Sequence, residues 1–443
     1  MAGSTHAADK ITGDHGPGLW DCPVVAQAGP DEDVGMTQPV RPPLTVVVAG
    51  GGIAGAEALL ALRALAGERV TLTLVAPDQD LVLRPLAVAE PFSLGHATHH
   101  PLADLVAAAG VDWVADHLAE VDAGSRRIVL RSGERREYDA LVVAIGARAV
   151  PSIEHATTWW QDGDREAFGG LLRDLEVDDA RRVAFVVPEG AVWPLPAYEL
   201  ALMTAGEVSG IGMNDAEIIV VTPEADPLEL FGPEASRTVR EELAAAGVRL
   251  ETSATARIER RHSTTLLLEP SGRRVLVDRV VAMPQVTGVA IPGLPADDAG
   301  FLPVDAHGRV RGVEHVWAAG DGIAYPVKFG GLATQQADAV AADIASLAGA
   351  PVEPEPWRPR LEGVLMTGGR PRPLKAGGEA TVTTASSARP LWAPVGKVAG
   401  RYLGAFIGEP TVPPPSDAGI RLETVLPDPT GAGALRDTEG RAG

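Results

Sequence analysis

The chain has 443 residues, which is enough for two or three domains and a sizeable core. It carries 38 Lys and Arg against 59 Asp and Glu, giving a net charge of -21. This charge argues against a free nucleic-acid partner, because phosphate neutralisation needs basic patches. The single cysteine, Cys22, excludes an intramolecular disulfide and a redox-active cysteine pair.

No stretch of about 20 residues is apolar throughout, so we expect no transmembrane helix. The first residues, MAGSTHAADKITGDHG, lack the basic-then-apolar order of a secretory signal, which favours a cytoplasmic location. Residues 1–42 and 410–443 are rich in small and polar residues without periodicity. We expect them to be disordered tails.

The first elements alternate between strands and a helix. Apolar strands are expected at 45–50 and 70–76, with a helix at 54–66 between them. This order indicates a parallel sheet covered on both faces. Short antiparallel strands are expected over 111–137, with a turn around Gly133, and a buried strand follows at 138–147.

A second strand-helix-strand unit follows. It comprises a strand at 183–187, a helix from Tyr198 and a strand at 217–224. A further strand pair is expected between 248 and 283. The chain then returns to a buried strand at 313–321 and a long helix at 331–347.

The predicted fold class is α/β, with two nested Rossmann-like dinucleotide-binding domains and a small C-terminal domain. The second domain is inserted into the first. The expected domains are a first FAD-binding part at 43–150, an NAD(P)-binding-like domain at 151–285, a second FAD-binding part at 286–350, and a C-terminal domain at 351–409.

The motif AGGGIAG places Gly50, Gly52 and Gly55 in GxGxxG spacing between the first strand and the first helix. The first glycine allows a tight turn, the second lets a pyrophosphate approach the backbone, and the third permits close helix packing. With Ile53 and Ala54, these residues predict a dinucleotide site. Asp78 follows the second strand, either to hold a ribose or simply as a turn residue.

Three further stretches extend the pattern: VLRPLAVAEPF, YDALVVAIGARAVP and VWAAGDG. With them the chain resembles the pyridine nucleotide-disulfide oxidoreductase superfamily, in particular its sulfide:quinone oxidoreductase and type II NADH dehydrogenase branch. The resemblance covers about residues 44–407 and implies FAD as the cofactor. It assigns cofactor-binding roles to the following residues: Arg84, Ala144, Gly146, Gly320 and Asp321.

The helix near Gly331 and Leu332 would direct its positive N-terminal dipole at the flavin pyrimidine. Lys328 precedes it and either tunes the flavin or is a solvated loop lysine. Gln335 and Gln336 either face the site or lie on the helix surface.

In place of a glycine-rich turn, the second unit has FVVPEGAVWPLPAYELALMTA, with Pro188, Pro194 and Pro196. Prolines donate no N–H, and side chains at Trp193 and Leu195 would crowd a pyrophosphate. Conventional NAD(P) binding is therefore uncertain here. Glu224, after the next strand, remains a candidate for holding a ribose and otherwise a charged loop tip.

The resemblance also matches Glu199 to a helix glutamate near the flavin, which makes it a candidate catalytic residue with Lys328. The alternative for Glu199 is an ordinary surface glutamate. Relatives that process sulfur use cysteines beside the flavin, and this chain has none in its folded region. We therefore expect transfer of a hydride or electrons from a small-molecule donor to an acceptor such as a quinone.

Two other clusters carry weaker signals. His96, His99 and His100 have helical spacing but lack the cysteines or acids that complete a metal site, so no metal is predicted. An apolar helix face is expected near the C-terminus, with basic residues beside it. It either packs on the chain itself or on a second subunit, or makes a peripheral membrane contact. Its residues are Trp392, Val395, Lys397, Val398, Arg401, Tyr402, Phe406 and Ile407.

Overall fold

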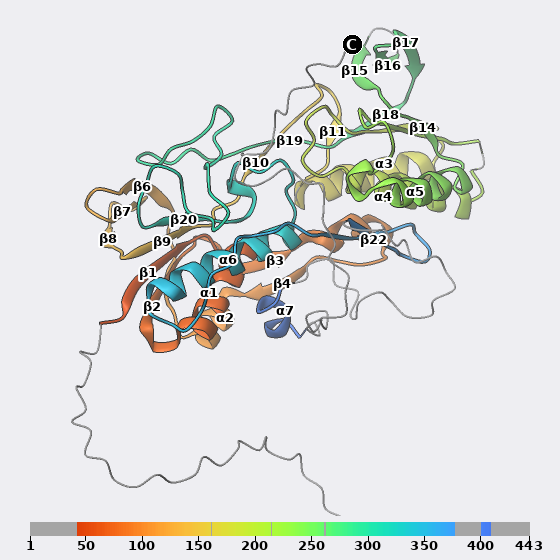
Figure 1. The fold of residues 1–443 in the computed structure, drawn as a ribbon. Helices are drawn as coiled ribbons and strands as arrows, with labels where there is room; N and C mark the ends of the chain where they lie inside the picture. The colour runs from red at the N-terminus through yellow and green to blue at the C-terminus, as the bar shows by residue number, and fades with distance from the viewer. Residues whose placement is uncertain (1–41, 161, 214, 261–262, 377–399, 409–443) are drawn as a thin grey trace, which may run out of the picture. The chain divides into compact units, whose positions relative to one another are not determined.

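The computed structural model describes residues 42–160, 162–213, 215–260, 263–376 and 400–408. Its first sheet has five strands, and every neighbouring pair is parallel (Figure 1). In spatial order they are β20 (Val316–Ala318), β9 (Ala140–Val143), β1 (Leu44–Ala49), β2 (Val70–Val75) and β5 (Asp112–Val114). The central strand β1 is apolar and buried over its last four residues, as a strand with helices on both faces requires.

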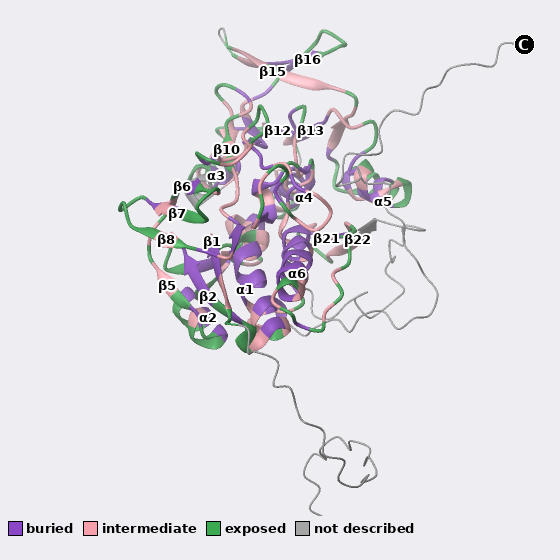
Figure 2. Ribbon diagram, turned by 60° about the vertical axis from the view of Figure 1, so that its left-hand side comes forward, coloured by how far each residue is buried: buried purple, intermediate pink, exposed green. Residues whose placement is uncertain are grey.

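Two long helices pack side by side against this sheet, α1 (Ile53–Ala66) and α6 (Gly330–Leu347) (Figure 1). Both are rich in alanine on their buried faces, and small side chains let helix axes approach closely. Figure 2 shows both helices largely buried. A shorter helix, α2 (Leu102–Ala109), precedes β5 and ends at Gly110 in the left-handed conformation.

The second sheet is also five-stranded and parallel. Its spatial order is β11 (Thr157–Thr158), β18 (Arg279–Ala282), β12 (Arg182–Val186), β13 (Glu217–Val221) and β14 (Arg249–Glu251). Three helices belong to this unit: α3 (Asp162–Glu176), α4 (Leu195–Gly210) and α5 (Pro233–Ala245).

The chain passes between the two sheets twice. The outgoing strand β10 (Arg148–Val150) pairs antiparallel with the returning strand β19 (Gln285–Thr287), after which the chain re-enters the first sheet at β20. The expected fold class, two nested Rossmann-like units, is therefore confirmed. The domain boundaries predicted from the sequence remain predictions.

The chain also forms small antiparallel sheets outside the two parallel sheets. They are β3 (Asp80–Leu83) with β4 (Thr98–Pro101); β6 (Leu118–Asp122), β7 (Arg127–Leu130) and β8 (Arg135–Glu137); β15 (Thr255–Arg260), β16 (Thr264–Glu269) and β17 (Arg273–Leu276); and β21 (Leu361–Leu365) with β22 (Arg372–Ala376). Short helices complete the described chain: η1 (Gly67–Arg69), η2 (Arg84–Phe92), η3 (Glu229–Phe231), η4 (Gly320–Gly322) and α7 (Leu403–Phe406).

Three expectations about local structure were wrong. The strand at 112–114 is parallel and joins the first sheet, because its partner β2 is already fixed there. The region 248–283 holds five strands instead of one pair, because β14 and β18 join the second parallel sheet while three further strands pair with one another. His99 and His100 lie on strand β4, where neighbouring side chains point to opposite faces, so the three histidines do not share a helical face.

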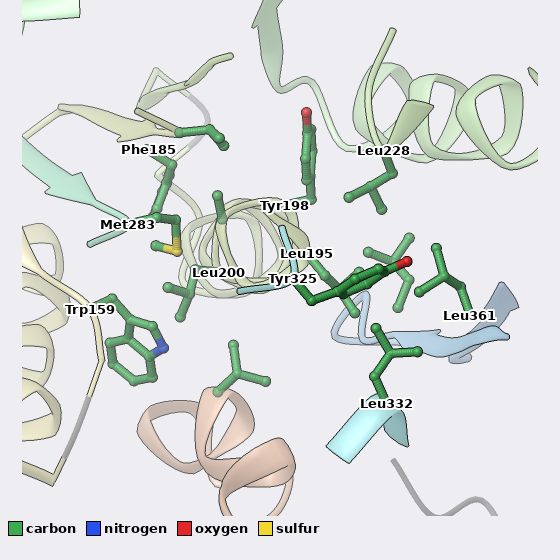
Figure 3. Packing of buried hydrophobic residues seen from close by; sticks show 14 of the residues in the cluster. Trp159, Phe185, Leu195, Tyr198, Leu200, Leu228, Met283, Tyr325, Leu332 and Leu361 are labelled. Carbon is green, nitrogen blue, oxygen red and sulfur yellow. The ribbon is translucent and has the colours of Figure 1, made fainter. Parts of the chain in front are cut away.

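The core runs through both units. Figure 3 shows Leu195 and Tyr198 of α4 together with Tyr325, Leu332 of α6 and Leu361 of β21. These residues come from segments far apart in the sequence and belong to one buried cluster. The start of α4, the place expected from the sequence for a second dinucleotide turn, therefore shares a buried cluster with residues that follow Asp321.

Candidate functional site

The turn between β1 and α1 is crowded by protein atoms at its first and last glycines and free of them at the middle one. Gly50 has φ +119°, and a Cβ there would lie 2.2 Å from the Ala144 carbonyl oxygen. A Cβ on Gly55 would lie 1.9 Å from the Gly50 carbonyl oxygen. Around Gly52, by contrast, a Cβ would meet nothing within 4 Å. The three glycines thus have the separate roles expected of GxGxxG spacing: a tight turn at Gly50, room for a pyrophosphate at Gly52 and close packing at Gly55.

The N-terminus of α1 is suited to an anion. Gly52 is its N-cap, no side chain caps it, and its first turn holds no acidic residue. The first intrahelical bond runs from the Ala56 N–H to the Gly52 carbonyl at 2.9 Å. The N–H groups of Ile53, Ala54 and Gly55 precede it and point out of the helix end, as a pyrophosphate requires.

Two further turns meet this one. Gly320, with φ +81°, places a hypothetical Cβ 2.9 Å from the Ala54 Cβ, and a Cβ on Gly322 would lie 3.0 Å from the Gly146 carbonyl oxygen. The turn after β9 and the turn after β20 therefore both adjoin the glycine motif. Five residues predicted to bind the cofactor, two from the glycine motif and three from the resemblance, are brought together here: Gly50, Ala54, Ala144, Gly146 and Gly320.

Asp321 follows at the strand end. Among the described residues, its side chain makes no hydrogen bond, which leaves it available to a ligand hydroxyl. Burial raises the pKa of Asp321, and the nearby Lys328 ammonium opposes that shift. The open space at Gly52, the free helix end and this carboxylate together fit the pyrophosphate and sugar hydroxyls of FAD.

Lys328 is buried rather than solvated, with 5% of its surface exposed. Its Nζ donates a hydrogen bond to the Ile323 carbonyl and lies 4.0 Å from the centre of the Phe301 ring. Burial lowers the pKa of Lys328 to about 8, while Asp321 and Asp297 act in the opposite direction. The solvated-loop alternative is wrong, and its role in catalysis remains a prediction.

The sequence left open whether the two glutamines of α6 face the site or lie on the helix surface. Gln336 is buried, and its Oε1 accepts a hydrogen bond of 2.7 Å from the Gly320 N–H, which fixes the turn that carries Asp321. The Gln335 side chain donates a hydrogen bond to the Arg360 carbonyl oxygen and accepts one from the Arg360 N–H, both at 3.0 Å. The surface alternative is therefore wrong for Gln336, whose place in the buried helical repeat with Leu332 was the available signal.

Four other candidate cofactor residues lie outside the group of residues that the three turns bring together. Arg84 begins η2 and is exposed, with no described contact to the glycine turn. Gly331 and Leu332 lie in the first turn of α6, whose N-cap is Phe329. Asp78 is exposed in the turn between β2 and β3. Binding by these residues remains a prediction.

The second dinucleotide turn is filled by the protein's own side chains. The Trp193 ring stacks on Phe329, with 4.3 Å between ring centres and 10° between planes, and meets Phe231 edge-on at 5.7 Å. The Lys328 N–H donates to the Val192 carbonyl at 3.2 Å. The turn before α4 is thus tied to the loop before α6.

The N-terminus of α4 also lacks donors. Pro194 is its N-cap and Pro196 has no N–H, while the Ala197 N–H is already bonded to the Pro194 carbonyl at 3.1 Å. In its first turn only Leu195 keeps an uncommitted N–H, and its side chain is buried. This helix end offers a pyrophosphate far fewer donors than α1 does.

Both glutamates of the second unit are engaged by the protein. Glu199 is buried, with 1% of its surface exposed, and its Oε1 accepts a 2.9 Å hydrogen bond from the Met366 N–H. The surface alternative for Glu199 is therefore wrong. Glu224 Oε2 accepts hydrogen bonds from the Tyr198 hydroxyl at 2.6 Å and the Thr222 hydroxyl at 2.9 Å. These two hydrogen bonds show that Glu224 is not a free loop-tip side chain, and burial raises the pKa of its carboxyl group.

The remaining predictions concern a metal site, a membrane span and the C-terminal apolar face. No group of three or more metal-ligating side chains occurs within the part of the chain that the structure describes. The described helices include none long and apolar enough to cross a membrane. Of the residues predicted for the C-terminal apolar face and the basic residues beside it, four lie outside the described residues: Trp392, Val395, Lys397 and Val398. Tyr402, Phe406 and Ile407 pack against the core beneath α1 and α6.

Two nested parallel units, a glycine turn with a free helix end and a strand-end aspartate define the class of two-dinucleotide-domain flavoproteins. Residues 44–341 match the model of the pyridine nucleotide-disulphide oxidoreductase family, and the chain belongs to that family. The expectation of an FAD-dependent oxidoreductase is thereby confirmed, whereas use of NAD(P) remains uncertain.

Individual relatives have a low sequence identity to this chain. The chain is 28% identical over 307 residues to the ferredoxin–NAD(+) reductase component of the biphenyl dioxygenase system of Paraburkholderia xenovorans, covering 65% of this chain and 69% of that protein. Its fold is similar to that of the sulfide:quinone oxidoreductase of Aquifex aeolicus, with a TM-score of 0.66, 19% identity, and 75% and 83% of the two chains covered. The ferredoxin reductase of the CYP199A2 system of Rhodopseudomonas palustris gives a TM-score of 0.55, 21% identity, and coverages of 74% and 81%.

Proposed function

We propose that this FAD-dependent oxidoreductase takes electrons from a donor other than NAD(P)H and passes them to an acceptor such as a quinone. The observation that carries the proposal is the Trp193–Phe329 stack, which fills the turn where relatives place a nicotinamide dinucleotide. The fold similarity to a sulfide:quinone oxidoreductase supports a quinone as the acceptor class.

The chain's own residues have separable roles in this proposal. Gly52 and the α1 N-terminus would hold the FAD pyrophosphate, and Asp321 would hold its sugar chain. The bound flavin supplies the capacity to accept a hydride or single electrons and release them again. Lys328, buried beside Asp321, would place a titratable cation at the site, and its pKa of about 8 lets it release or take up a proton near neutral pH.

The second turn argues against NAD(P) on steric and electrostatic grounds together. The Trp193 indole is held on two sides by Phe329 and Phe231, so moving it would break both ring contacts. Pro194 and Pro196 remove donors from the helix end that would otherwise bind a pyrophosphate. Neither obstacle disappears with a small side-chain rotation.

A second candidate function is reduction of the flavin by NAD(P)H bound in an unusual pose. Two observations favour it: Glu224 stands at the end of β13, where a ribose-binding acid would stand, and one relative is a ferredoxin–NAD(+) reductase. Against it, Tyr198 and Thr222 already hydrogen-bond the Glu224 carboxylate. A flavin-binding interaction protein without turnover is the remaining alternative.

The decisive experiment uses purified full-length protein loaded with FAD, without oxygen. NADH and NADPH at millimolar concentration are mixed with it, and the flavin absorbance is followed by stopped flow. We expect no fast bleaching. Rapid bleaching by either nucleotide would overturn the proposal in favour of the second candidate, and a colourless protein that rejects FAD would refute the cofactor assignment itself.

The acceptor is tested separately by photoreducing the bound flavin and adding a soluble quinone, a ferredoxin or ferricyanide. Reoxidation should be fastest with the quinone. Preference for ferredoxin would replace the proposed acceptor, and failure of every acceptor would favour the protein without turnover.

A further inference from the structure

A pair of carboxyl groups links α1 and α6 to the segment 400–408. Glu57 lies on α1, two residues after Gly55 of the glycine motif, and is fully buried. Its Oε1 accepts a 2.9 Å hydrogen bond from the Tyr402 N–H, and its Oε2 accepts a 2.6 Å hydrogen bond from the Leu403 N–H. Both oxygens of one buried side chain are therefore used to hold a segment more than 340 residues away in sequence.

The segment fits closely over this carboxylate. A Cβ on Gly400 would lie 2.7 Å from Glu57 Oε2 and 3.1 Å from the Thr334 Cγ2 on α6. Leu403 is fully buried in the cluster beneath α1 and α6. The contact is thus built from a glycine, two backbone donors and an apolar anchor.

Asp338 on α6 completes the pair. Its carboxyl group is within hydrogen-bonding reach of Glu57, and its Oδ1 is sealed from solvent without a donor from any described residue. Two carboxylates in such contact cannot both be ionised, because their repulsion in a poorly solvated site is large. A single proton on Asp338 removes the repulsion and lets one carboxyl group donate a hydrogen bond to the other.

We propose that Glu57 and Asp338 share one proton and together act as a latch that holds residues 400–408 on α1 and α6. The latch depends on the protonation of the pair. Helix α1 begins at the glycine turn, and Gln336 of α6 accepts a hydrogen bond from the Gly320 N–H, so the latch ties this segment to two helices that contact the candidate cofactor site. Nothing in this inference depends on which donor or acceptor the flavin uses.

The charged and titratable groups at the latch come from three elements. They are Glu57 on α1, Asp338 on α6, and Arg401 with Tyr402 on the segment itself. Burial and the Glu57 carboxylate raise the pKa of Asp338 to about 8 from 3.8, and Arg401 opposes the shift. Burial also raises the pKa of Glu57, while the two backbone donors oppose it.

The sign of the pH effect follows from these directions. The latched state holds a proton that the open, solvated pair releases more readily, so rising pH favours opening. For one proton, the opening equilibrium grows by at most about tenfold per pH unit. The growth should stop once the pH passes the latched-state pKa of about 8.

Hydrogen exchange of full-length, FAD-loaded protein tests the latch. The protection factor of the peptide covering 400–408 is measured from pH 6 to pH 9, with intrinsic rates taken from a synthetic peptide of the same sequence. We expect wild-type protection to fall with pH and level off near pH 8. The exposed-acid control Glu68→Gln should follow the wild type.

Three variants make the test specific. Asp338→Asn keeps a donor to Glu57 at every pH, so protection should stay high and lose its pH dependence. Glu57→Gln replaces one of the two acceptor oxygens by a donor amide and should lower protection throughout. Arg401→Gln removes the charge that opposes the shared proton and should move the levelling point to higher pH.

The inference is overturned if wild-type protection is independent of pH, or if Asp338→Asn titrates as the wild type does. Unchanged protection in Glu57→Gln would show that the carboxylate does not hold the segment. If Asp338→Asn fails to fold, the shift in Arg401→Gln, a substitution at an exposed residue, decides the question alone.

Discussion

Substitutions at two glycines of the same motif should separate cofactor binding from folding. Gly55→Ala places a methyl group 1.9 Å from the Gly50 carbonyl oxygen, so the backbone must move by more than an ångström. Gly52→Ala places the same methyl group where the protein has no atom within 4 Å. One variant should damage the protein alone, and the other should damage the complex with FAD.

The expected magnitudes differ accordingly. Overpacking a closed contact costs about 1–3 kcal/mol, so Gly55→Ala should destabilise the FAD-free protein by at least that amount. Alanine in place of a glycine N-cap costs up to about 1 kcal/mol, so the FAD-free Gly52→Ala protein should be nearly as stable as the wild type. At FAD concentrations of about 100 times Kd, binding adds about 2.7 kcal/mol of stability, and a tenfold weaker affinity removes about 1.3 kcal/mol of it.

The assay is urea unfolding of each variant with and without FAD, together with direct titration of FAD by fluorescence quenching. Gly52→Ala should lose at least tenfold in affinity while keeping its stability without FAD. The reasoning is refuted if Gly52→Ala binds FAD as the wild type does. It is also refuted if Gly55→Ala, the more crowded site, is the more stable of the two without cofactor.

Three further predictions concern side chains around the site. Lys328→Met should remove a pH dependence of wild-type stability, because burial lowers the Lys328 pKa from 10.5 to about 8. Between pH 7 and pH 10 the free energy of unfolding of the wild type should rise by about 2–3 kcal/mol relative to that of the variant. Parallel stability curves for the two proteins would contradict the buried ammonium. Gln336→Leu should lower the free energy of unfolding by about 1–3 kcal/mol and weaken FAD binding, because the buried Gly320 N–H loses its acceptor. Gln336→Glu keeps an acceptor and should bind FAD normally. Equal FAD titrations for the two variants would exclude this positioning role. Glu199→Leu should lose about 1–3 kcal/mol by leaving the Met366 N–H unpaired, and Glu199→Gln should keep the fold. A pH–rate profile unchanged in Glu199→Gln would then exclude proton transfer by this residue.

The fold class could be predicted from the sequence, because the signals that indicate it are local. Apolar runs such as Leu44–Ala49 and Val70–Val75, a helix between them and GxGxxG spacing require neighbours only a few residues apart. The same reasoning identified the proline-rich second turn as a departure, since a missing N–H follows from residue type alone.

The contacts of individual side chains could be assigned only from the folded chain. Gln336, Glu199 and Lys328 all allowed a surface interpretation, and burial against distant segments overruled it in each case. The number of strands between 248 and 283 likewise depended on turns and on pairing partners that local propensity does not specify.

Long-range pairs were beyond sequence reasoning altogether. Trp193 and Phe329 are 136 positions apart and stack only because two nested units bring the turns before α4 and α6 together. Glu57 and the N–H of Tyr402 are joined across 345 positions. Single-sequence periodicity reports the face on which a residue lies, and only the packed chain determines which residue meets it there.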